Sequence, residues 1–338
     1  MRLDQIDGLR FWACMVVVAS HVGVFGLWGQ GGIIVSLFFV LSGFFISKPL
    51  KPDGEEDFLS VRGWGSFYLS RIVRIIPIHW SSLLLTYWLF PNAFTFERIL
   101  RNMFFLEGWA HLWFLSHEVL CYILAPAAMA AAALMKRYFK VKNIWLGAGF
   151  FVLSVLLHIY FYNITAFRVV GQPFRIDLFI LGIAFCYLYK SGVLQVIHRR
   201  PLSLTADLLS ILLILAVHFS GCRILARISP ALSEYMIGWE RPWLCGFLGG
   251  ILILLVALNP GGIVSRVFSF PWFVQMGRAS YGIYIIHYYY FIIYPQPLAT
   301  PMRNFIVDSL FSCCVSLVFF RWVEEPLYRL VKKRRKNI

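Results

Sequence analysis

Long apolar runs separated by short polar loops dominate the chain. Because about twenty apolar residues are needed to cross the hydrocarbon core of a bilayer, each run predicts a transmembrane helix. These helices are predicted at residues 9–27, 31–47, 72–90, 110–135, 144–163, 174–190, 203–219, 243–258, 271–294 and 304–323. The pattern therefore predicts an all-α, polytopic membrane protein of about ten transmembrane helices, with residues 1–338 forming a single transmembrane domain.

The composition agrees with lipid as the main solvent. Of the 338 residues, 60% are hydrophobic and 14% are charged, and the mean hydropathy is +0.73, outside the balance of soluble domains. The net charge of +15 comes from short Lys and Arg clusters between the apolar runs. That placement indicates membrane-edge charge and argues against nucleic-acid binding. The seven cysteines form no C-x-x-C pair, so we expect small hydrophobic side chains and no metal site.

The basic loops predict an orientation. Lys and Arg residues follow the fourth, sixth and last predicted helices, at positions 136–142, 190–200 and 332–336. The positive-inside rule places these loops in the cytoplasm, and an even number of helices places both termini there too. No small-residue cleavage site follows the first helix, so we interpret it as a retained anchor.

Ionisable side chains inside the membrane are costly and commonly mark function. In the predicted spans this rule selects His21, Glu118, Asp177 and His287. A second group stands near helix ends: Arg10, Arg71, Arg74, Arg175 and Glu324.

Arg10 and His21 are predicted to share one face of the first helix. They are eleven residues apart, which is about three turns and roughly 16 Å along the axis. A cation at the cytoplasmic edge and an imidazole deeper in the membrane would suit an elongated ligand with an anionic head. The alternative is an arginine that extends to the headgroups and a histidine bonded to a neighbouring helix.

Arg71 and Arg74 are three residues apart and are predicted to lie at the cytoplasmic start of the third helix, with Pro77 one turn later at a helix start or kink. Two guanidinium groups there would suit a phosphorylated ligand. The alternative is ordinary positive-inside anchoring.

Glu118 lies about two turns into the fourth predicted helix, and His21 about two turns from the far end of the first. Similar depth suggests that the carboxylate orients the imidazole. The alternative is that Glu118 accepts a local hydrogen bond from a Trp or Ser.

Six segments, in order, resemble the acyltransferase 3 family of membrane proteins. They are Asp7 to Arg10 followed by His21, Phe38 to Phe44, Arg71 to Pro77, Leu112 to Glu118, Ser280 to His287, and Val323 to Pro326. Together they extend over nearly the whole chain.

The resemblance implies a bacterial inner-membrane enzyme that moves an acetyl group from cytoplasmic acetyl-coenzyme A to a hydroxyl of a glycan acceptor. O-antigen, exopolysaccharide and lipid-linked precursors are candidate acceptors, succinyl or another short acyl group is the alternative cargo, and no metal is implied. Arg10, Arg71 and Arg74 would receive the phosphates of the donor. His21 would be a general base or a transient acyl carrier, aided by Arg10 and Glu118. The residues expected to bind the acceptor are Trp113, Ser116, Asp177, Arg175 and His287.

The chain departs from the family pattern at three positions. His117 stands where an apolar residue is expected, Val119 where a second acid is common, and Glu325 where a basic residue is usual. Some relatives carry a serine-hydrolase-like domain after the last helix, and this sequence has none there. We therefore expect the chain to finish the transfer itself or to pass the acyl group to a separate protein.

Two other functions are compatible with charged groups inside a membrane. A proton-coupled or solute transporter also uses intramembrane His, Glu and Asp, but it should show symmetry between the halves of the chain, which the sequence lacks. A noncatalytic partner in a glycan-assembly complex is the other alternative. Release of free coenzyme A would distinguish an enzyme from both.

Overall fold

The computed structural model describes residues 3–24, 31–47, 50–90, 95–164, 167–198, 202–220, 240–293 and 300–336. Nearly all of these residues are helical. The first half of the chain contains α1 (Asp4–Val22), α2 (Gly31–Ile46), η2 (Gly54–Leu59), α3 (Val61–Leu89), α4 (Phe96–Met103), η3 (Ala110–Leu112), α5 (Trp113–Phe139), α6 (Asn143–Ile159) and the π-helical η4 (Tyr160–Ile164).

The second half begins with a two-stranded antiparallel hairpin and continues as helices. Its elements are β1 (Arg168–Val169), β2 (Gln172–Pro173), α7 (Ile176–Lys190), η5 (Gln195–His198), α8 (Leu202–Ser220), α11 (Glu240–Leu258), α12 (Ile263–Phe268), α13 (Pro271–Arg278), α14 (Ser280–Ile293), α15 (Pro301–Phe319), η6 (Phe320–Glu324) and α16 (Glu325–Lys336).

Each predicted span coincides with helix over most of its described residues, but three boundaries are corrected. Helix α3 begins at Val61 instead of residue 72, because Ser60 caps it by accepting a hydrogen bond from the Gly63 N–H at 3.0 Å. The span 271–294 is two helices, α13 and α14, separated at Ala279. Helix α15 continues through η6 into α16. The predicted ends at 25–27 and 294 lie outside the described residues.

Several helices are apolar and long enough to cross a bilayer. Four segments meet this requirement by length and composition: Val61–Leu89, Ala110–Phe139, Asn143–Tyr162 and Pro301–Val331. Three shorter apolar helices cover Gly31–Ile46, Leu202–His218 and Pro242–Leu258. These findings support a multi-pass membrane protein, while the count of ten spans stays a prediction.

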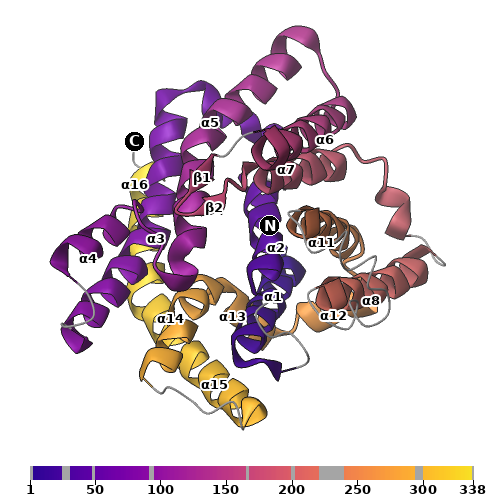
Figure 1. Cartoon of the computed structure of the whole chain (residues 1–338). Helices are drawn as coiled ribbons and strands as arrows, with labels where there is room; N and C mark the ends of the chain where they lie inside the picture. The colour runs from indigo at the N-terminus through magenta and orange to yellow at the C-terminus, as the bar shows by residue number, and fades with distance from the viewer. Residues whose placement is uncertain are drawn as a thin grey trace.

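Helices α1 and α2 occupy the middle of the molecule (Figure 1), with α3, α4 and α5 on one side and α6, α7, α8 and α11 on the other. Helices α2 and α7 cross with almost no space between their backbones. A Cβ atom built on Gly43 would lie 1.9 Å from the Phe179 carbonyl oxygen, and one built on Gly182 would lie 2.1 Å from the Val40 oxygen. Small residues allow this close packing, as is common between membrane helices.

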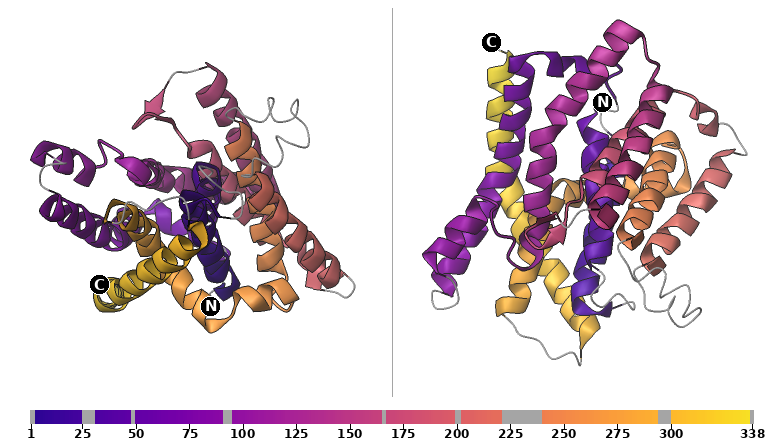
Figure 2. Two further views of the ribbon diagram at one scale, coloured as in Figure 1. Left: turned by 60° about the horizontal axis from the view of Figure 1, so that its bottom comes forward. Right: turned by 45° about the horizontal axis from the view of Figure 1, so that its top comes forward.

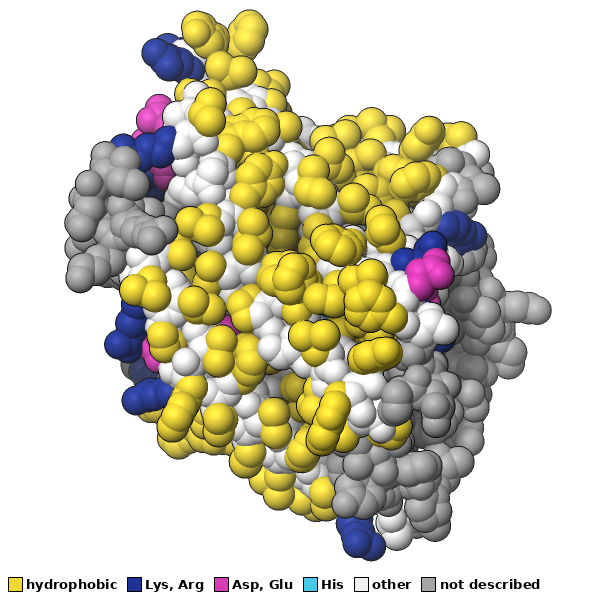
Figure 3. All heavy atoms as spheres, turned by 90° about the vertical axis from the view of Figure 1, so that its left-hand side faces the viewer, with side chains coloured by type: hydrophobic (Ala, Val, Ile, Leu, Met, Phe, Trp, Pro, Cys, Tyr) yellow, Lys and Arg dark blue, Asp and Glu magenta, His cyan; other side chains and the backbone are white. Residues whose placement is uncertain are grey.

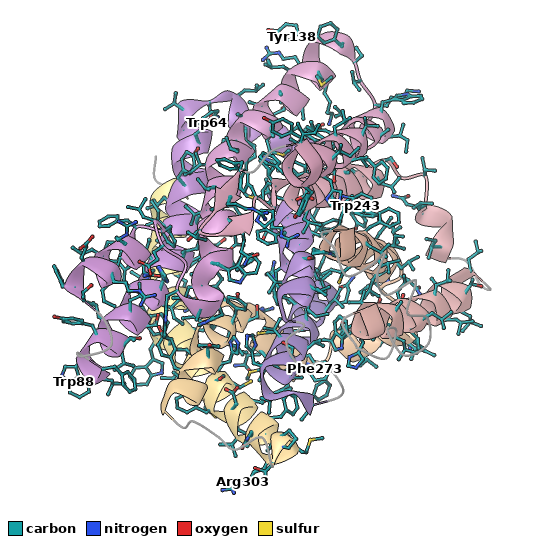
Figure 4. The ribbon with its side chains drawn as sticks, viewed as in Figure 1. Trp64, Trp88, Tyr138, Trp243, Phe273 and Arg303 are labelled. Carbon is teal, nitrogen blue, oxygen red and sulfur yellow. The ribbon has the colours of Figure 1, made fainter. Side chains whose placement is uncertain are left out.

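Different helix ends lie at the two ends of the molecule. In the right-hand view of Figure 2 the starts of α1 and α3 and the ends of α5 and α16 lie toward the same end. Figure 4 places Tyr138, at the end of α5, opposite Arg303, at the start of α15. Hydrophobic side chains spread across the middle of the face in Figure 3, with Lys and Arg mostly at its margins. A hydrophobic surface bordered by charge fits a lipid surround.

A buried carboxylate ties η2 to the ends of two helices. Glu55 is 1% exposed, and its oxygens lie 2.5 Å from the ammonium of Lys136 on α5 and 3.0 Å from that of Lys190 on α7. Lys136 also hydrogen-bonds Asp53 at 2.7 Å, which lowers the pKa of that carboxyl. Two loops that the positive-inside rule places in the cytoplasm are thereby held at one end of the structure.

Candidate functional site

A cavity of about 180 Å³ lies where the end of α1 meets the start of α2, the junction of η3 with α5, and α14. We call it the His21 cavity. Gly32 and Ala110 are exposed at its rim, so it opens at the end of the molecule where α1 finishes. Its lining residues are Val17, His21, Gly31, Gly32, Val35, Ala110, His111, Trp113, Tyr284 and Tyr288.

His21 lies against His287 of α14. The Nε2 atom of His287 is 3.4 Å from Nδ1 of His21, and the ring centres are 4.9 Å apart. Nδ1 of His21 is also 2.9 Å from the carbonyl oxygen of Val17, and Nδ1 of His287 is 2.6 Å from that of Tyr284. Because a carbonyl oxygen can only accept, each neutral ring carries its proton on Nδ1. His287 therefore presents a lone pair to the Nδ1–H of His21, whose basic nitrogen is Nε2.

The predicted pairing of Glu118 with His21 is wrong. Oε1 of Glu118 accepts hydrogen bonds from Ser42 Oγ and from the Tyr122 hydroxyl, each at 2.7 Å. The carboxylate lines a different cavity from His21. Similar depth did not fix the direction of the side chain, and His287 takes the position that depth alone had given to Glu118.

That second cavity, which we call the Arg74 cavity, adjoins the first. It is lined by Arg10, Phe38, Ser42, Arg74, Phe114, Glu118, Ser280, Tyr281 and Tyr284. Its volume is about 20 Å³, room for about one water molecule. Tyr284 lines both cavities, so they meet at its side chain. Arg10 and His21, predicted to share a face of α1, thus line two adjoining spaces.

The paired arginines lie well inside α3, not at its start as predicted, because the helix begins at Val61. Helix α3 also continues through Pro77. The Arg74 guanidinium lies 5.8 Å from the ring centre of Tyr281 and lines the cavity. The Arg71 guanidinium packs instead over Tyr122, at 4.9 Å, and the neighbouring Phe67 ring, beside the cavity.

Asp177 and Arg175 belong to another cluster, so grouping them with the acceptor site is corrected. His158 Nδ1 lies 2.9 Å from Asp177 Oδ2, and the Arg175 guanidinium donates a hydrogen bond to the Tyr162 hydroxyl. Neither residue lines the His21 cavity.

Of the other predicted acceptor residues, Trp113 and His287 are at the His21 cavity, Trp113 in its wall and His287 against His21. Ser116 is buried and lines neither cavity.

His111 is a cavity residue for which sequence reasoning gave no role. The available signal was its place directly before the segment Leu112 to Glu118. Its ring centre lies 5.1 Å from that of His287 and 4.8 Å from that of Tyr288. Within the described part of the chain, no group of three or more His, Cys, Asp or Glu side chains is arranged to hold a metal ion.

A family model described as an acyltransferase domain matches residues 3–322. The chain belongs to the acyltransferase 3 family.

Two curated relatives are bacterial proteins. One is the peptidoglycan O-acetyltransferase OatA of Listeria monocytogenes, which is 25% identical over 361 residues covering 96% of this chain and 56% of the relative. The other is the O-acetyltransferase OatA of Staphylococcus aureus, 23% identical over 370 residues covering 96% of this chain and 57% of the relative. This acyltransferase 3 chain therefore spans little more than half the length of these relatives. No solved structure matches it.

The segments that resemble the family meet at the two cavities. Arg10, Ser42, Arg74, Glu118 and Tyr281 represent five of the six segments at the Arg74 cavity, and the first, fourth and fifth also reach the His21 cavity. The sixth, around Glu324, lines neither.

The departures from the family pattern have local explanations. His117 is buried, and its Nε2–H donates to the Val169 carbonyl oxygen at 2.9 Å while its Nδ1 accepts from the Arg175 N–H at 3.3 Å, so it fastens the hairpin to α5. Glu325 pairs with Arg329 at 2.8 Å on the exposed face of α16. Val119 packs against the hydrophobic core.

Proposed function

We propose that this protein is a membrane O-acyltransferase that moves a short acyl group, acetyl in the first instance, from a coenzyme A thioester to a hydroxyl of a glycan. The observation that carries the proposal is that Tyr284 lines two cavities, of which one is lined by Arg10 and Arg74 and the other by His21. Anion-binding groups and a proton acceptor are thereby joined through the protein. The family and the O-acetyltransferase relatives support this reaction class.

His21 acts as the general base of the proposed reaction. Its Nε2 takes the proton of the acceptor hydroxyl while the hydroxyl oxygen attacks the acyl carbonyl carbon. The new ester bond forms, the C–S bond breaks, and the departing thiolate ends with the proton. During the step His21 becomes an imidazolium, whose Nδ1–H faces the Val17 carbonyl oxygen and the Nε2 lone pair of His287. These two acceptors stabilise the charge that develops on the ring.

The donor binds from the side of the arginines. Arg10 and Arg74 in the Arg74 cavity, with Arg71 beside them, receive phosphate groups of coenzyme A, because guanidinium forks match phosphate oxygens. The acyl end then extends past Tyr284 toward His21. Since the Arg74 cavity holds about 20 Å³, passage of the acyl end requires Tyr284 or its aromatic neighbours Phe38 and Phe114 to move.

The acceptor is a glycan of the cell envelope, lipid-linked precursors included, and it enters the His21 cavity at the rim formed by Gly32 and Ala110. We place the protein in the bacterial inner membrane, with both termini in the cytoplasm. The common end occupied by the start of α1 and the end of α16 supports this orientation (Figure 2), as do Lys136 and Lys190 gathered on Glu55.

A vesicle assay tests reaction and orientation together. Membrane vesicles that contain the protein are prepared right-side-out and inside-out, acetyl-coenzyme A is added to the bulk solution, and free coenzyme A and acetylated glycan fragments are measured. We expect inside-out vesicles to consume the added donor, because their cytoplasmic face is exposed, and sealed right-side-out vesicles to leave it intact. Absence of coenzyme A release in both preparations would reject the enzyme, and release from right-side-out vesicles would reject the orientation.

Arg74 is expected to act on the donor. A hydrogen bond between charged groups contributes about 1.5–3 kcal/mol, and about 1.4 kcal/mol corresponds to a factor of ten. Arg74→Ala should therefore raise the KM for acetyl-coenzyme A about tenfold or more, with kcat near the wild-type value at saturating donor. Arg329→Ala is the matched control, because Arg329 is an exposed arginine on α16. Normal acylation by Arg74→Ala at limiting donor would show that Arg74 is a membrane anchor.

A further inference from the structure

His111 has no part in the proposed proton transfer, yet its ring is fixed in the wall of the His21 cavity. Its Nε2 lies 3.0 Å from the carbonyl oxygen of Ile285 on α14. The ring stacks on Tyr288 with centres 4.8 Å apart and planes 28° apart. The backbone carbonyl of His111 accepts the Tyr284 hydroxyl at 2.6 Å. Contacts from α14 therefore hold both the ring and the backbone of this residue.

The turn that presents His111 is itself strained. Ala110, directly before it, has a φ of +49°, in the left-handed region that costs a residue with a Cβ roughly 1–2 kcal/mol. Strain of this kind persists where surrounding contacts impose it and is concentrated at functional sites. Here it lies at the rim of the His21 cavity.

The hydrogen bonds of His111 determine which nitrogen is left for a ligand. Because the Ile285 carbonyl can only accept, Nε2 carries the proton and Nδ1 keeps its lone pair. His111 is 4% exposed, and Nδ1 has no hydrogen-bond partner among the described residues. A buried acceptor without a donor is unfavourable by roughly 1–3 kcal/mol. His111 lines the cavity but Nδ1 itself is buried, so a donor group that enters the cavity satisfies this lone pair once the surrounding wall moves aside.

The size and walls of the cavity indicate the kind of donor. About 180 Å³ is the space of about six water molecules at ~30 Å³ each, which suits one sugar ring. Trp113 and Tyr288 line it, and aromatic rings offer apolar faces next to polar edges. The donor that fits these surroundings is a hydroxyl group of a sugar.

We propose that His111 positions the acceptor: its Nδ1 accepts a hydrogen bond from a second hydroxyl of the same sugar ring whose attacking hydroxyl is held at His21. This inference rests on the proposed function, and it makes His111 a positioning residue that selects sugars carrying both hydroxyls. The His287 ring lies 4.9 Å from His21 and 5.1 Å from His111, so both rings stand beside the same histidine.

Two substitutions separate the nitrogens of His111. In His111→Gln the longer amide can keep the hydrogen bond to the Ile285 carbonyl but leaves no acceptor at the Nδ1 position. In His111→Asn the shorter amide keeps an oxygen near Nδ1 and loses the bond to Ile285. We expect His111→Gln to raise the acceptor KM about three- to tenfold, with donor KM unchanged and kcat little affected, and His111→Asn to retain more of the acceptor affinity.

Monodeoxy sugars identify the partner of His111. The probes are methyl glycosides of glucose, galactose, mannose and N-acetylglucosamine, and the monodeoxy analogues of whichever binds. Binding to the detergent-solubilised full chain is measured by calorimetry, and acetyl transfer separately. We expect one deoxy analogue to bind the wild type about three- to tenfold more weakly and to show no further loss with His111→Gln.

The outcomes distinguish this inference from the proposed function. If one deoxy analogue binds more weakly and His111→Gln adds no further loss, but no acetyl transfer occurs, the role of His111 is supported and the enzyme is rejected. If acetyl transfer occurs but the loss of affinity caused by His111→Gln multiplies with the loss caused by every deoxy analogue, the role of His111 is rejected and the proposed function stands. If the wild type binds none of the four methyl glycosides, the cavity does not take a single sugar ring and the inference is wrong.

Discussion

Replacing His21 by alanine is expected to lower the turnover of glycan acylation by about 10²–10⁴-fold, the range that general acid–base catalysis contributes. The defect should persist at saturating acyl donor, because the lost group acts in the chemical step. His21 lines a cavity that opens at its rim, so the variant should still insert and fold. Expression-matched membranes assayed for acetylated glycan and free coenzyme A provide the measurement.

His21→Gln is the more selective variant. Glutamine keeps a polar amide at this position but cannot take up a proton at neutral pH, so we expect it to be as inactive as alanine. His158→Asn is a matched control, because an amide near the Nδ1 position can still donate to Asp177 Oδ2 outside the His21 cavity. Near-normal acylation by His21→Gln would make His21 structural and move the search for the base to His287.

The second large effect is expected at the crossing of α2 and α7. Gly182→Val should prevent the folded protein from accumulating, because a Cβ at position 182 would meet the Val40 carbonyl oxygen at 2.1 Å and the Phe44 nitrogen at 2.9 Å. Both contacts are backbone atoms, so the helices themselves must separate. Overpacking commonly costs about 1–3 kcal/mol, and here the added methyl groups make it larger. The measurements are the yield of monodisperse protein in detergent and its thermal unfolding midpoint.

Gly149→Ala on α6 is the control for that substitution. A Cβ at position 149 would have no atom within 4 Å, and alanine favours a helix by about 1 kcal/mol over glycine. We expect this variant to keep or raise the unfolding midpoint. A monodisperse Gly182→Val protein that melts at the wild-type temperature would contradict the close packing of α2 on α7.

The hydrophobic pattern predicted most helices because length and apolarity act locally. It failed where polar residues belong to a helix. Val61 to Ser70 contain Arg62 and four glycine or serine positions, so an apolar window begins too late for α3. The break at Ala279 was missed because the apolar residues of α13 and α14 were joined into one span across the polar positions Gln275, Arg278 and Ser280.

The site was predicted in part. Spacing along one helix placed Arg10 and His21 on a common face, since both are on α1. Which residue meets His21 depends on how α14 is rotated against α1, and depth carries no information about that rotation. Glu118 was therefore paired wrongly, while His287 was assigned to the acceptor without its contact to His21. His111 could not be given a role because its importance depends on one nitrogen bonded to α14 and the other buried without a hydrogen-bond partner among the described residues.

The small volume of the Arg74 cavity, which adjoins the His21 cavity at Tyr284, also bears on ion leakage across the membrane. A bacterial membrane maintains an electrical potential, and each elementary charge that leaks across 100 mV dissipates about 2.3 kcal/mol. A wide aqueous channel from the arginines to His21 would conduct protons and ions down that gradient. The Arg74 cavity, at about 20 Å³, has room for about one water molecule and not for a column of water. We therefore expect the barrier to stay electrically tight between turnovers, so that the proposed acyl transfer would not dissipate the membrane potential.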